Sequence, residues 1–160
     1  MKVSGLVRAD HPLTAQLSTT PCVAYKCEVK WEYGQTKYYR INYDAEGREV
    51  PRYEANSPSD YYGSDRIETR TDVSKESIHA DSKEIKFFVE DETSSVMINP
   101  ASGSMKYVST VNDYRSASGR DYLIQYGSFR KDVGYLFRNR EKQTRGFEYK
   151  EEGQSELKCL

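Results

Sequence analysis

The residues best suited to metal binding in this chain are its histidines and cysteines, and they are sparse. His11 and His79 are the only histidines, they lack the i,i+4 spacing of a helical ligand pair, and the chain contains no Cys-x-x-Cys motif. A zinc site needs three or four clustered nitrogen or sulfur ligands. The sequence therefore predicts no metal site and no bound cofactor.

Cys22 is the clearest candidate nucleophile, because it follows Pro21 at the start of a predicted strand. A small, half-buried side chain on a strand is the simpler interpretation. The acids of "EDET", residues 90–93, could form a general acid–base pair, but a charged hairpin turn is the favoured interpretation. The chain has neither a Gly-x-Ser-x-Gly elbow nor a Walker-type phosphate loop. We predict that this chain is not an enzyme, and a Cys22 nucleophile is our third hypothesis.

A basic stretch between residues 129 and 146 is the one pronounced charge feature. It contains six basic and two acidic residues, which gives a local charge of +4 in a chain whose net charge is −1. Tyr135 and Phe137 lie among them. A solvated strand face is the simplest interpretation, and the functional ones are contact with an anionic membrane surface or a nucleic-acid groove. The basic residues are Arg130, Lys131, Arg138, Arg140, Lys142 and Arg145.

The composition indicates one β-rich, soluble domain. The chain has 160 residues, 31% of them charged, a mean hydropathy of −0.87 and 14 tyrosines. No apolar run approaches the roughly 18–20 residues that span a bilayer. A net charge near zero excludes whole-protein attraction to nucleic acid. Three cysteines, Cys22, Cys27 and Cys159, are too few and too uneven for a disulfide framework.

The stretch "CVAYKCEVKWEY", residues 22–33, shows the clearest strand pattern. Apolar residues stand at the odd positions and polar ones at most even positions, which is the period of a half-buried strand. The pattern predicts Trp31 and Cys27 in the core, with Cys22 on the opposite face from Cys27. "YGQT", residues 33–36, then predicts a turn that joins this strand to "KYYRINY" in a long hairpin.

Two further segments complete the expected organisation. Residues 44–82 are polar and contain two prolines, so they read as an insertion with at most a short strand or two near "RIETRTDV". Residues 83–103 contain two apolar runs around six polar residues, which predicts a second hairpin. Later strands are expected at "SMKYVSTV", "DYLIQYG", "VGYLFRN" and "TRGFEYKE".

Three blocks, "HPLTAQLSTTPCVAYKCEV", "FFVEDETSSVMINPASG" and "RGFEYKEEGQSELKCL", occur in this order. Together they resemble the GIDE domain, also named the BAM ("beside a membrane") domain. That domain occurs in membrane-embedded RING E3 ubiquitin ligases of organelle outer membranes and in prokaryotic relatives. Ser94 stands where the family has a glycine. The residues that match family motifs are Pro21, Cys22, Tyr25, Asp91, Thr93, Pro100, Gly146, Tyr149 and Glu151.

The resemblance implies that residues 1–160 form a single soluble domain that lies between two transmembrane helices in a longer, membrane-associated protein. Both helices and any RING finger would then lie outside this chain. The resemblance also implies that the basic stretch lies close to the second helix. Beside anionic lipid, each Lys or Arg gains about 1 kcal/mol.

We therefore expect a mainly β fold, a twisted antiparallel sheet that closes into a small, partly open barrel of the OB type. The first functional hypothesis is a non-catalytic interaction or sensing domain whose partner is another protein, with an anionic membrane surface nearby. The alternative is an OB-like module that binds nucleic acid or a nucleotide through the basic stretch. The near-zero net charge makes nucleic acid the weaker of these partners.

Overall fold

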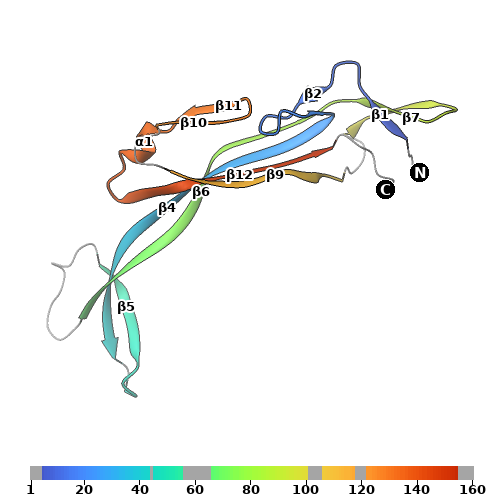
Figure 1. Cartoon of the computed structure of the whole chain (residues 1–160). Helices are drawn as coiled ribbons and strands as arrows, with labels where there is room; N and C mark the ends of the chain where they lie inside the picture. Colours follow the sequence, from blue (N-terminus) through green and yellow to red (C-terminus); the bar gives the residue numbers. More distant parts are fainter. Residues whose placement is uncertain (1–4, 44, 56–65, 101–105, 118–121, 155–160) are drawn as a thin grey trace.

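The fold is mainly β, as the sequence predicts, with one short helix. The computed structural model describes residues 5–43, 45–55, 66–100, 106–117 and 122–154 (Figure 1). All of its strand pairs are antiparallel. The elements are β1 (Leu6–Arg8), β2 (Leu13–Thr14), β3 (Pro21–Cys22), β4 (Ala24–Tyr43), β5 (Glu49–Ala55), β6 (Arg66–Glu84), β7 (Phe87–Glu90), β8 (Ser95–Ile98), β9 (Val108–Ser116), β10 (Leu123–Tyr126), β11 (Phe129–Asp132), α1 (Gly134–Phe137) and β12 (Lys142–Gln154).

The main sheet has the strand order β6-β4-β12-β9, and β5 pairs with the distal half of β4. Strand β12 is central, because it pairs with β4 on one side and with β9 on the other. Beyond the body of the molecule, β4, β5 and β6 continue as a long arm (Figure 1). Among the described strands this sheet is open at β6 and at β9, and no closed barrel is found.

The predicted hairpin at residues 33–36 is wrong. Strand β4 continues through Gly34 without a turn, and it pairs with β6 from Ala24↔Glu84 to Ile41↔Arg66. The partner strand β6 lies largely inside the segment that the sequence presented as a polar insertion. Its side chains are mostly exposed, so no apolar alternation marks it as a strand. Backbone pairing with β4, which side-chain patterning does not reveal, holds it in the sheet.

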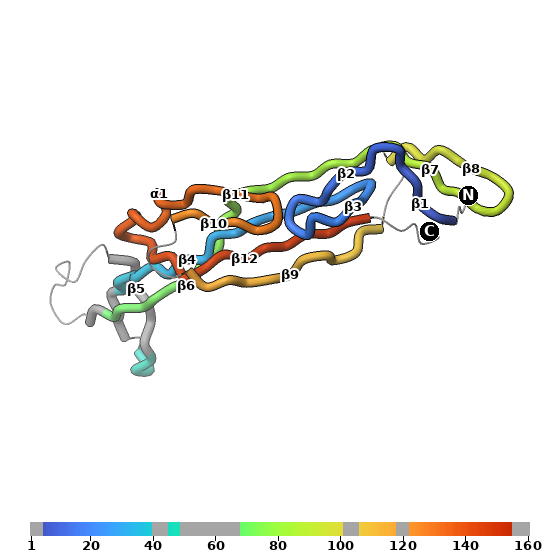
Figure 2. Tube along the Cα trace, turned by 45° about the horizontal axis from the view of Figure 1, so that its top comes forward, coloured from blue at the N-terminus to red at the C-terminus, as the bar shows by residue number. Residues whose placement is uncertain are grey.

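One face of the main sheet is covered by a second layer made of β10, β11, α1 and the segment that carries β2 and β3 (Figure 2). The alternation predicted for β4 is confirmed, since its odd positions from Tyr25 to Tyr33 are buried under this layer. Trp31 is 3% exposed, and its indole Nε1 donates to Thr144 Oγ1 at 2.9 Å. The prediction that Trp31 is a core residue is therefore confirmed.

The prediction that Cys22 and Cys27 occupy opposite faces is wrong. Both thiols are buried in the same apolar cluster and both are free. The reason is a bend at Val23, which separates β3 from β4 and interrupts the alternation. Val23 itself packs into a second, smaller cluster with Phe87 and Val89.

The small sheet β1-β7-β8 forms that second cluster, and it contains the hairpin predicted for residues 83–103. Its turn is closed by Asp91, whose Oδ1 accepts hydrogen bonds from the backbone N–H groups of Thr93 at 2.8 Å and Ser94 at 2.7 Å. A serine is thus accommodated where the family has a glycine. Val23 N–H donates to Gln154 O at 3.0 Å, so the end of β12 lies close to the junction with this small sheet (Figure 1).

Candidate functional site

The basic stretch spans β11, α1, the following loop and the start of β12, and half of its cations are engaged within the fold. Lys142 Nζ lies 3.1 Å from Glu76 Oε1 and 4.8 Å from the centre of the Tyr33 ring. Its hydrogen bond with Glu76 raises the pKa of Lys142. Lys131 Nζ donates to a backbone oxygen of β6 at 3.3 Å, and Arg145 Nε lies 3.8 Å from Glu32 Oε1. These three side chains therefore fasten elements of the fold together.

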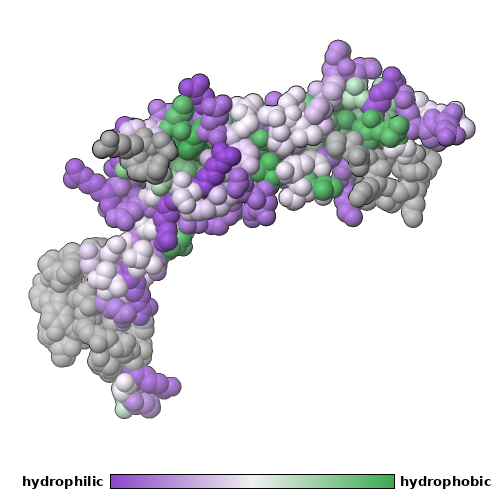
Figure 3. Space-filling model, in the orientation of Figure 1, coloured by the Kyte–Doolittle hydropathy of each residue, from purple (hydrophilic) through white to green (hydrophobic). Residues whose placement is uncertain are grey.

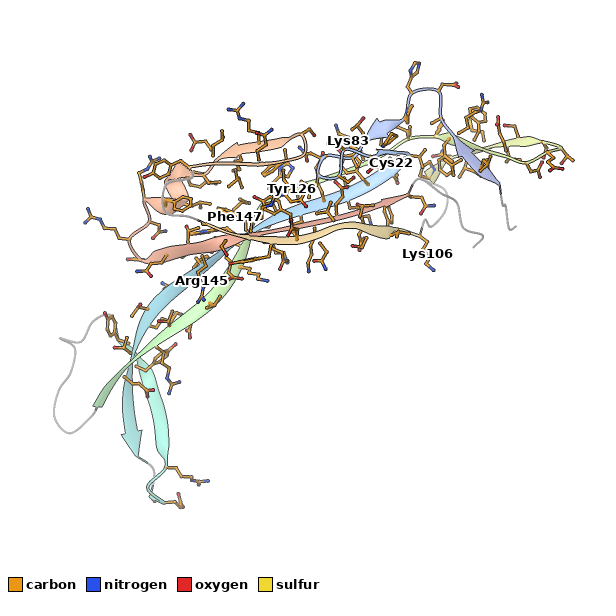
Figure 4. The ribbon with its side chains drawn as sticks, viewed as in Figure 1. Cys22, Lys83, Lys106, Tyr126, Arg145 and Phe147 are labelled. Atoms are coloured by element: carbon orange, nitrogen blue, oxygen red, sulfur yellow. The ribbon has the colours of Figure 1, made fainter. Side chains whose placement is uncertain are left out.

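The side chain of Arg145 does not lie on the covered side of the sheet. A β-bulge between Thr144 and Gly146 shifts the register of β12. Figure 4 shows Phe147 and Tyr126 between the sheet and the β10–β11 layer, whereas Arg145 points away from that layer. The six basic residues are consequently divided between two faces of the sheet and do not form one patch.

Arg130, Arg138 and Arg140 are exposed, and no ion pair involves them within the part of the chain that the structure describes. Two exposed tyrosines accompany them, Tyr122 at 52% and Tyr135 at 51%, together with Leu123 at 45%. Figure 3 shows apolar and hydrophilic groups side by side over the β10–α1 layer. We name this set the aromatic–arginine face; it consists of Tyr122, Leu123, Tyr135, Arg130, Arg138 and Arg140.

Local geometry brings these residues together. Leu123 and Arg130 lie on the outer side of the β10–β11 hairpin, because Leu123 pairs with Asp132 and Gln125 pairs with Arg130. The backbone N–H of Val133 donates to Tyr122 O at 2.6 Å, which brings α1 against the start of β10. A methyl group added at Gly134 would lie within 3.6 Å of both Tyr122 Cβ and Arg138 Nη1. Tyr122 and Arg138 therefore flank the first residue of α1.

Sequence reasoning found the arginines of this face and missed Tyr122 and Leu123. A usable signal was present in "DYLIQYG". Leu123 and Ile124 are adjacent apolar residues, so a strand must send one of them to each face. Ile124 is buried, and Leu123 is the one left in solvent.

The two ends of β12 lie far apart. The strand runs from Lys142 to Gln154, which at roughly 3.3 Å per residue places its two ends about 40 Å apart. The family resemblance had implied that the basic stretch lies close to a second membrane helix. In space, β12 carries the chain away from Lys142, whereas the β10–β11 turn next to Arg130 contacts Gln16, whose neighbour Leu17 is held by Glu151 near the far end of β12.

Glu151 is the most deeply buried charged side chain among the described residues, with 1% exposure. Its carboxylate accepts hydrogen bonds from the N–H of Leu17 at 2.7 Å, the N–H of Ser18 at 3.2 Å and Thr110 Oγ1 at 2.9 Å. These bonds attach the segment between β2 and β3 to β12 and β9. The carboxylate is satisfied by groups of the protein itself, which is the arrangement of a structural residue.

The two buried thiols beside Glu151 are poorly suited to nucleophilic chemistry. Burial, reinforced by the charge of Glu151, raises the pKa of the Cys22 thiol. Burial and the nearby charge of Asp81 raise that of Cys27 to about 11. A nucleophilic cysteine needs a lowered pKa. Cys27 Sγ and His79 Nε2 both contact Gln16 Oε1, at 3.3 Å and 2.7 Å, in an arrangement that ties β4 to β6 and the covering segment.

The remaining family-motif residues are also engaged in the fold. Tyr25 donates to Asp81 Oδ2 at 2.9 Å, and burial raises its pKa. Pro100 is buried, and Tyr149 packs against Tyr126 with ring centres 4.5 Å apart. A side chain at Gly146 would collide with the Tyr114 hydroxyl, so glycine is required there. Cys159 and the last residues of the third sequence block lie outside the described residues.

Within the described ranges, no group of three or more His, Cys, Asp or Glu side chains is arranged to hold a metal ion. The strongest charge clusters are ion pairs on the outer face of the sheet. The aromatic–arginine face instead presents exposed arginines beside exposed tyrosines and a leucine.

Comparison with protein families gives a match to the GIDE model, described as E3 ubiquitin ligase, over residues 60–154, more than half of the chain. The chain belongs to the GIDE family. Comparisons with curated proteins and with solved structures return no significant match. The matched region of this GIDE domain includes β6 to β12 with α1 and the aromatic–arginine face, whereas Pro21, Cys22 and Tyr25 precede it.

The family places this chain among domains associated with E3 ubiquitin ligases. In the described parts of this GIDE domain, no helix has the length and apolar character that crossing a bilayer requires.

Proposed function

We propose that this GIDE domain is a non-catalytic protein-interaction module of a membrane-associated, E3-ligase-related protein, and that its aromatic–arginine face binds an acidic segment of another protein. The observation that carries the proposal is the combination of two exposed tyrosines and a leucine with three arginines that have no ion-pair partner in the described structure. Tyrosine and arginine are enriched in the energetic centres of protein interfaces.

The chemistry of this face favours carboxylates bound next to apolar groups. An arginine presents a planar fork that matches a carboxylate. Tyr122 and Tyr135 add apolar area at a small cost in side-chain entropy, because each has only two rotatable side-chain bonds. A partner segment that carries acids beside an apolar residue would engage both components.

The family likeness supports a parent protein that is associated with a membrane, but the small number of exposed arginines does not favour lipid as the ligand of this face. Three exposed arginines beside anionic lipid gain about 3 kcal/mol together, which corresponds to a Kd weaker than about 1 mM. Nucleic acid is a weaker candidate still, since a chain of net charge −1 attracts a polyanion only locally.

A direct test uses a fluorescent ten-residue peptide of Glu and Asp with one central Phe, titrated with the domain at physiological salt. We expect a Kd on the order of 0.1 mM, which corresponds to about 5–6 kcal/mol. The double variants Tyr122→Ala/Tyr135→Ala and Arg138→Ala/Arg140→Ala should each weaken binding at least tenfold.

The matched control is Lys83→Ala/Lys106→Ala, which removes two exposed cations far from the face (Figure 4). It should leave the Kd unchanged. Anionic vesicles and a single-stranded dT20 oligonucleotide serve as competing probes. Tighter binding of either probe than of the peptide, lost in the Arg138/Arg140 variant, would contradict the proposal and favour a membrane or a nucleic acid as the ligand.

A further inference from the structure

The outer edge of β9 has no strand partner among the described residues. Through its other edge, β9 pairs with β12 from Val108↔Gly153 to Ser116↔Gly146. The opposite edge of the sheet is different. There Lys131 Nζ reaches the backbone oxygen of Ile78 in β6, and Phe129 packs against His79.

The devices that protect the β9 edge are a bulge at Thr110 and the charges of Asp113 and Arg115. Proline, lysine and bulges prevent edge-to-edge pairing in natural sheets. Between Val111 and Ser116, β9 contains neither proline nor lysine. The bulge in its pairing with β12 lies between Glu151 and Glu152, next to Thr110 and outside this segment. Strand β6, in contrast, carries Lys, Glu and Asp residues along much of its length.

From this edge we propose that the domain self-associates: β9 pairs antiparallel with β9 of a second copy about a twofold axis at Tyr114. In this register Asp113 lies opposite Arg115 of the second copy, and Arg115 lies opposite its Asp113. Opposite charges at directly facing positions favour a strand pair, and like charges disfavour it. The proposal does not depend on the function proposed above.

The placement of these side chains in the single copy agrees with this register. Asp113 and Arg115 pair with Tyr149 and Phe147, so both lie on the covered face of the sheet. They remain about half exposed, and Arg115 Nε lies only 3.6 Å from Asp113 Oδ2 of its own strand. Both also contact Tyr126, whose hydroxyl donates to Asp113 Oδ2 at 3.1 Å and whose ring centre lies 4.3 Å from Arg115 Cζ, so an incoming strand offers these charges a second partner of opposite sign.

Neighbouring registers lose this match. An axis at Asp113 places Asp113 opposite Asp113 of the second copy, and an axis at Arg115 places Arg115 opposite Arg115 of the second copy. Both arrangements bring like charges together. An axis at Asn112 places Asp113 opposite Val111. Only the axis at Tyr114 pairs both charges with opposite charges.

Apolar surface is covered in the same register. Val111 of one copy faces Ala117 of the other, on the side of the sheet where Ala117 lines a pocket with Leu123, Ile124 and Phe147. On the other side of the sheet the backbone of Tyr114 lies on the axis, while its ring lies beside Gly146 and its hydroxyl donates to Glu32 Oε1 at 3.1 Å. The interface has isologous symmetry, which is the commonest form of dimer.

A cysteine placed on the axis tests the register directly. In a Cys159→Ser background, Tyr114→Cys puts two thiols directly opposite each other, and mild oxidation should give a disulfide-linked dimer. Asn112→Cys is the matched control, because residue 112 faces Ser116 of the other copy and not itself. Cys22 and Cys27 are buried and do not interfere. Absence of a linked dimer, or equal cross-linking of both variants, would overturn the proposal.

A charge exchange tests the same contact without a covalent bond. Asp113→Arg and Arg115→Asp should each weaken dimerisation at least tenfold in analytical ultracentrifugation, and an equimolar mixture of the two variants should restore a heterodimer. Lys83→Asp on β6 should dimerise like the unmodified chain. Circular dichroism checks that each variant is folded. An unmodified chain that stays monomeric at millimolar concentration, or a mixture that stays monomeric, rejects the proposed pairing.

Discussion

On one face of the β4–β12–β9 sheet, Trp31 and Tyr149 lie under the β10–β11 layer, whereas on the other face Glu32 and Glu148 lie at the surface among lysines and arginines. Burial of apolar area stabilises the first face. Solvent-screened ion pairs connect the second, and such pairs contribute little. Adjacent residues of one strand, such as Glu148 and Tyr149, should therefore respond very differently to substitution.

The largest expected effect is on the covered face. Trp31→Ala removes a fully packed indole and should lower the free energy of unfolding by about 3–5 kcal/mol. Urea denaturation measures the loss. The control is Tyr135→Ala, an exposed aromatic whose removal should change stability by no more than about 0.5 kcal/mol. Since Trp31 is the only tryptophan, its native emission should also be blue-shifted. Equal losses from the two substitutions would mean that the layer does not bury Trp31.

Removal of the buried carboxylate of Glu151 should cause the next largest loss of stability. Glu151→Ala leaves the N–H groups of Leu17 and Ser18 and the hydroxyl of Thr110 without their acceptor. Unfolding free energy should fall by about 3 kcal/mol. Glu152→Ala, at the exposed neighbouring position, is the control and should be nearly neutral. If both variants unfold at the same denaturant concentration, Glu151 does not hold the β2–β3 segment in place.

Substitutions in the ion pairs on the outer face of the sheet should change stability least. Lys75 Nζ contacts Glu148 Oε2 at 2.5 Å, and this hydrogen bond lowers the pKa of Glu148 and raises that of Lys75. Because the folded pKa of Glu148 is lowered, its contribution is present above the ordinary glutamate pKa and lost as pH falls through the lowered value. Because that of Lys75 is raised, its contribution is present below the ordinary lysine pKa and lost as pH rises.

Melting curves of the unmodified chain and Glu148→Gln should therefore differ slightly at neutral pH and converge as the pH falls below the lowered pKa of Glu148. Added salt should also reduce the difference. A difference that persists in acid would show that Glu148 acts through packing and not through its charge.

The same contrast explains what could be predicted from sequence. The strand at residues 24–33, Trp31 in the core and the β7–β8 hairpin follow from side-chain alternation, because one side of each segment is buried. Strand β6 has mostly exposed side chains and pairs through its backbone, so it read as an insertion. The hairpin at "YGQT" failed for a related reason: Gly34 fits within an extended strand, and its long partner was not visible in the pattern.

The charged residues show a second limit. The sequence does not reveal which of Arg138 and Lys142 forms an ion pair. In the structure Lys142 pairs with Glu76, while Arg138 has no ion pair among the described residues. Whether a cation is available depends on which acids the fold brings near it. Cys22 shows the same limit in the core. Because the chain bends at Val23, the side chain of Cys22 lies in the apolar cluster and not on the solvent-facing side that alternation predicts.

The central position of β12 has a consequence for synthesis of the protein. Chains emerge from the ribosome in sequence order, and β12 follows every other described strand. Until it emerges, β9 has no partner in the sheet, and the half of β4 nearest Ala24 can pair only with β6. The two-stranded ribbon of β4 and β6 can form early, but the full sheet can form only after β12 has been synthesised. Until β12 emerges, the nascent domain therefore exposes an unpaired β9 and one open edge of β4, a situation that favours aggregation.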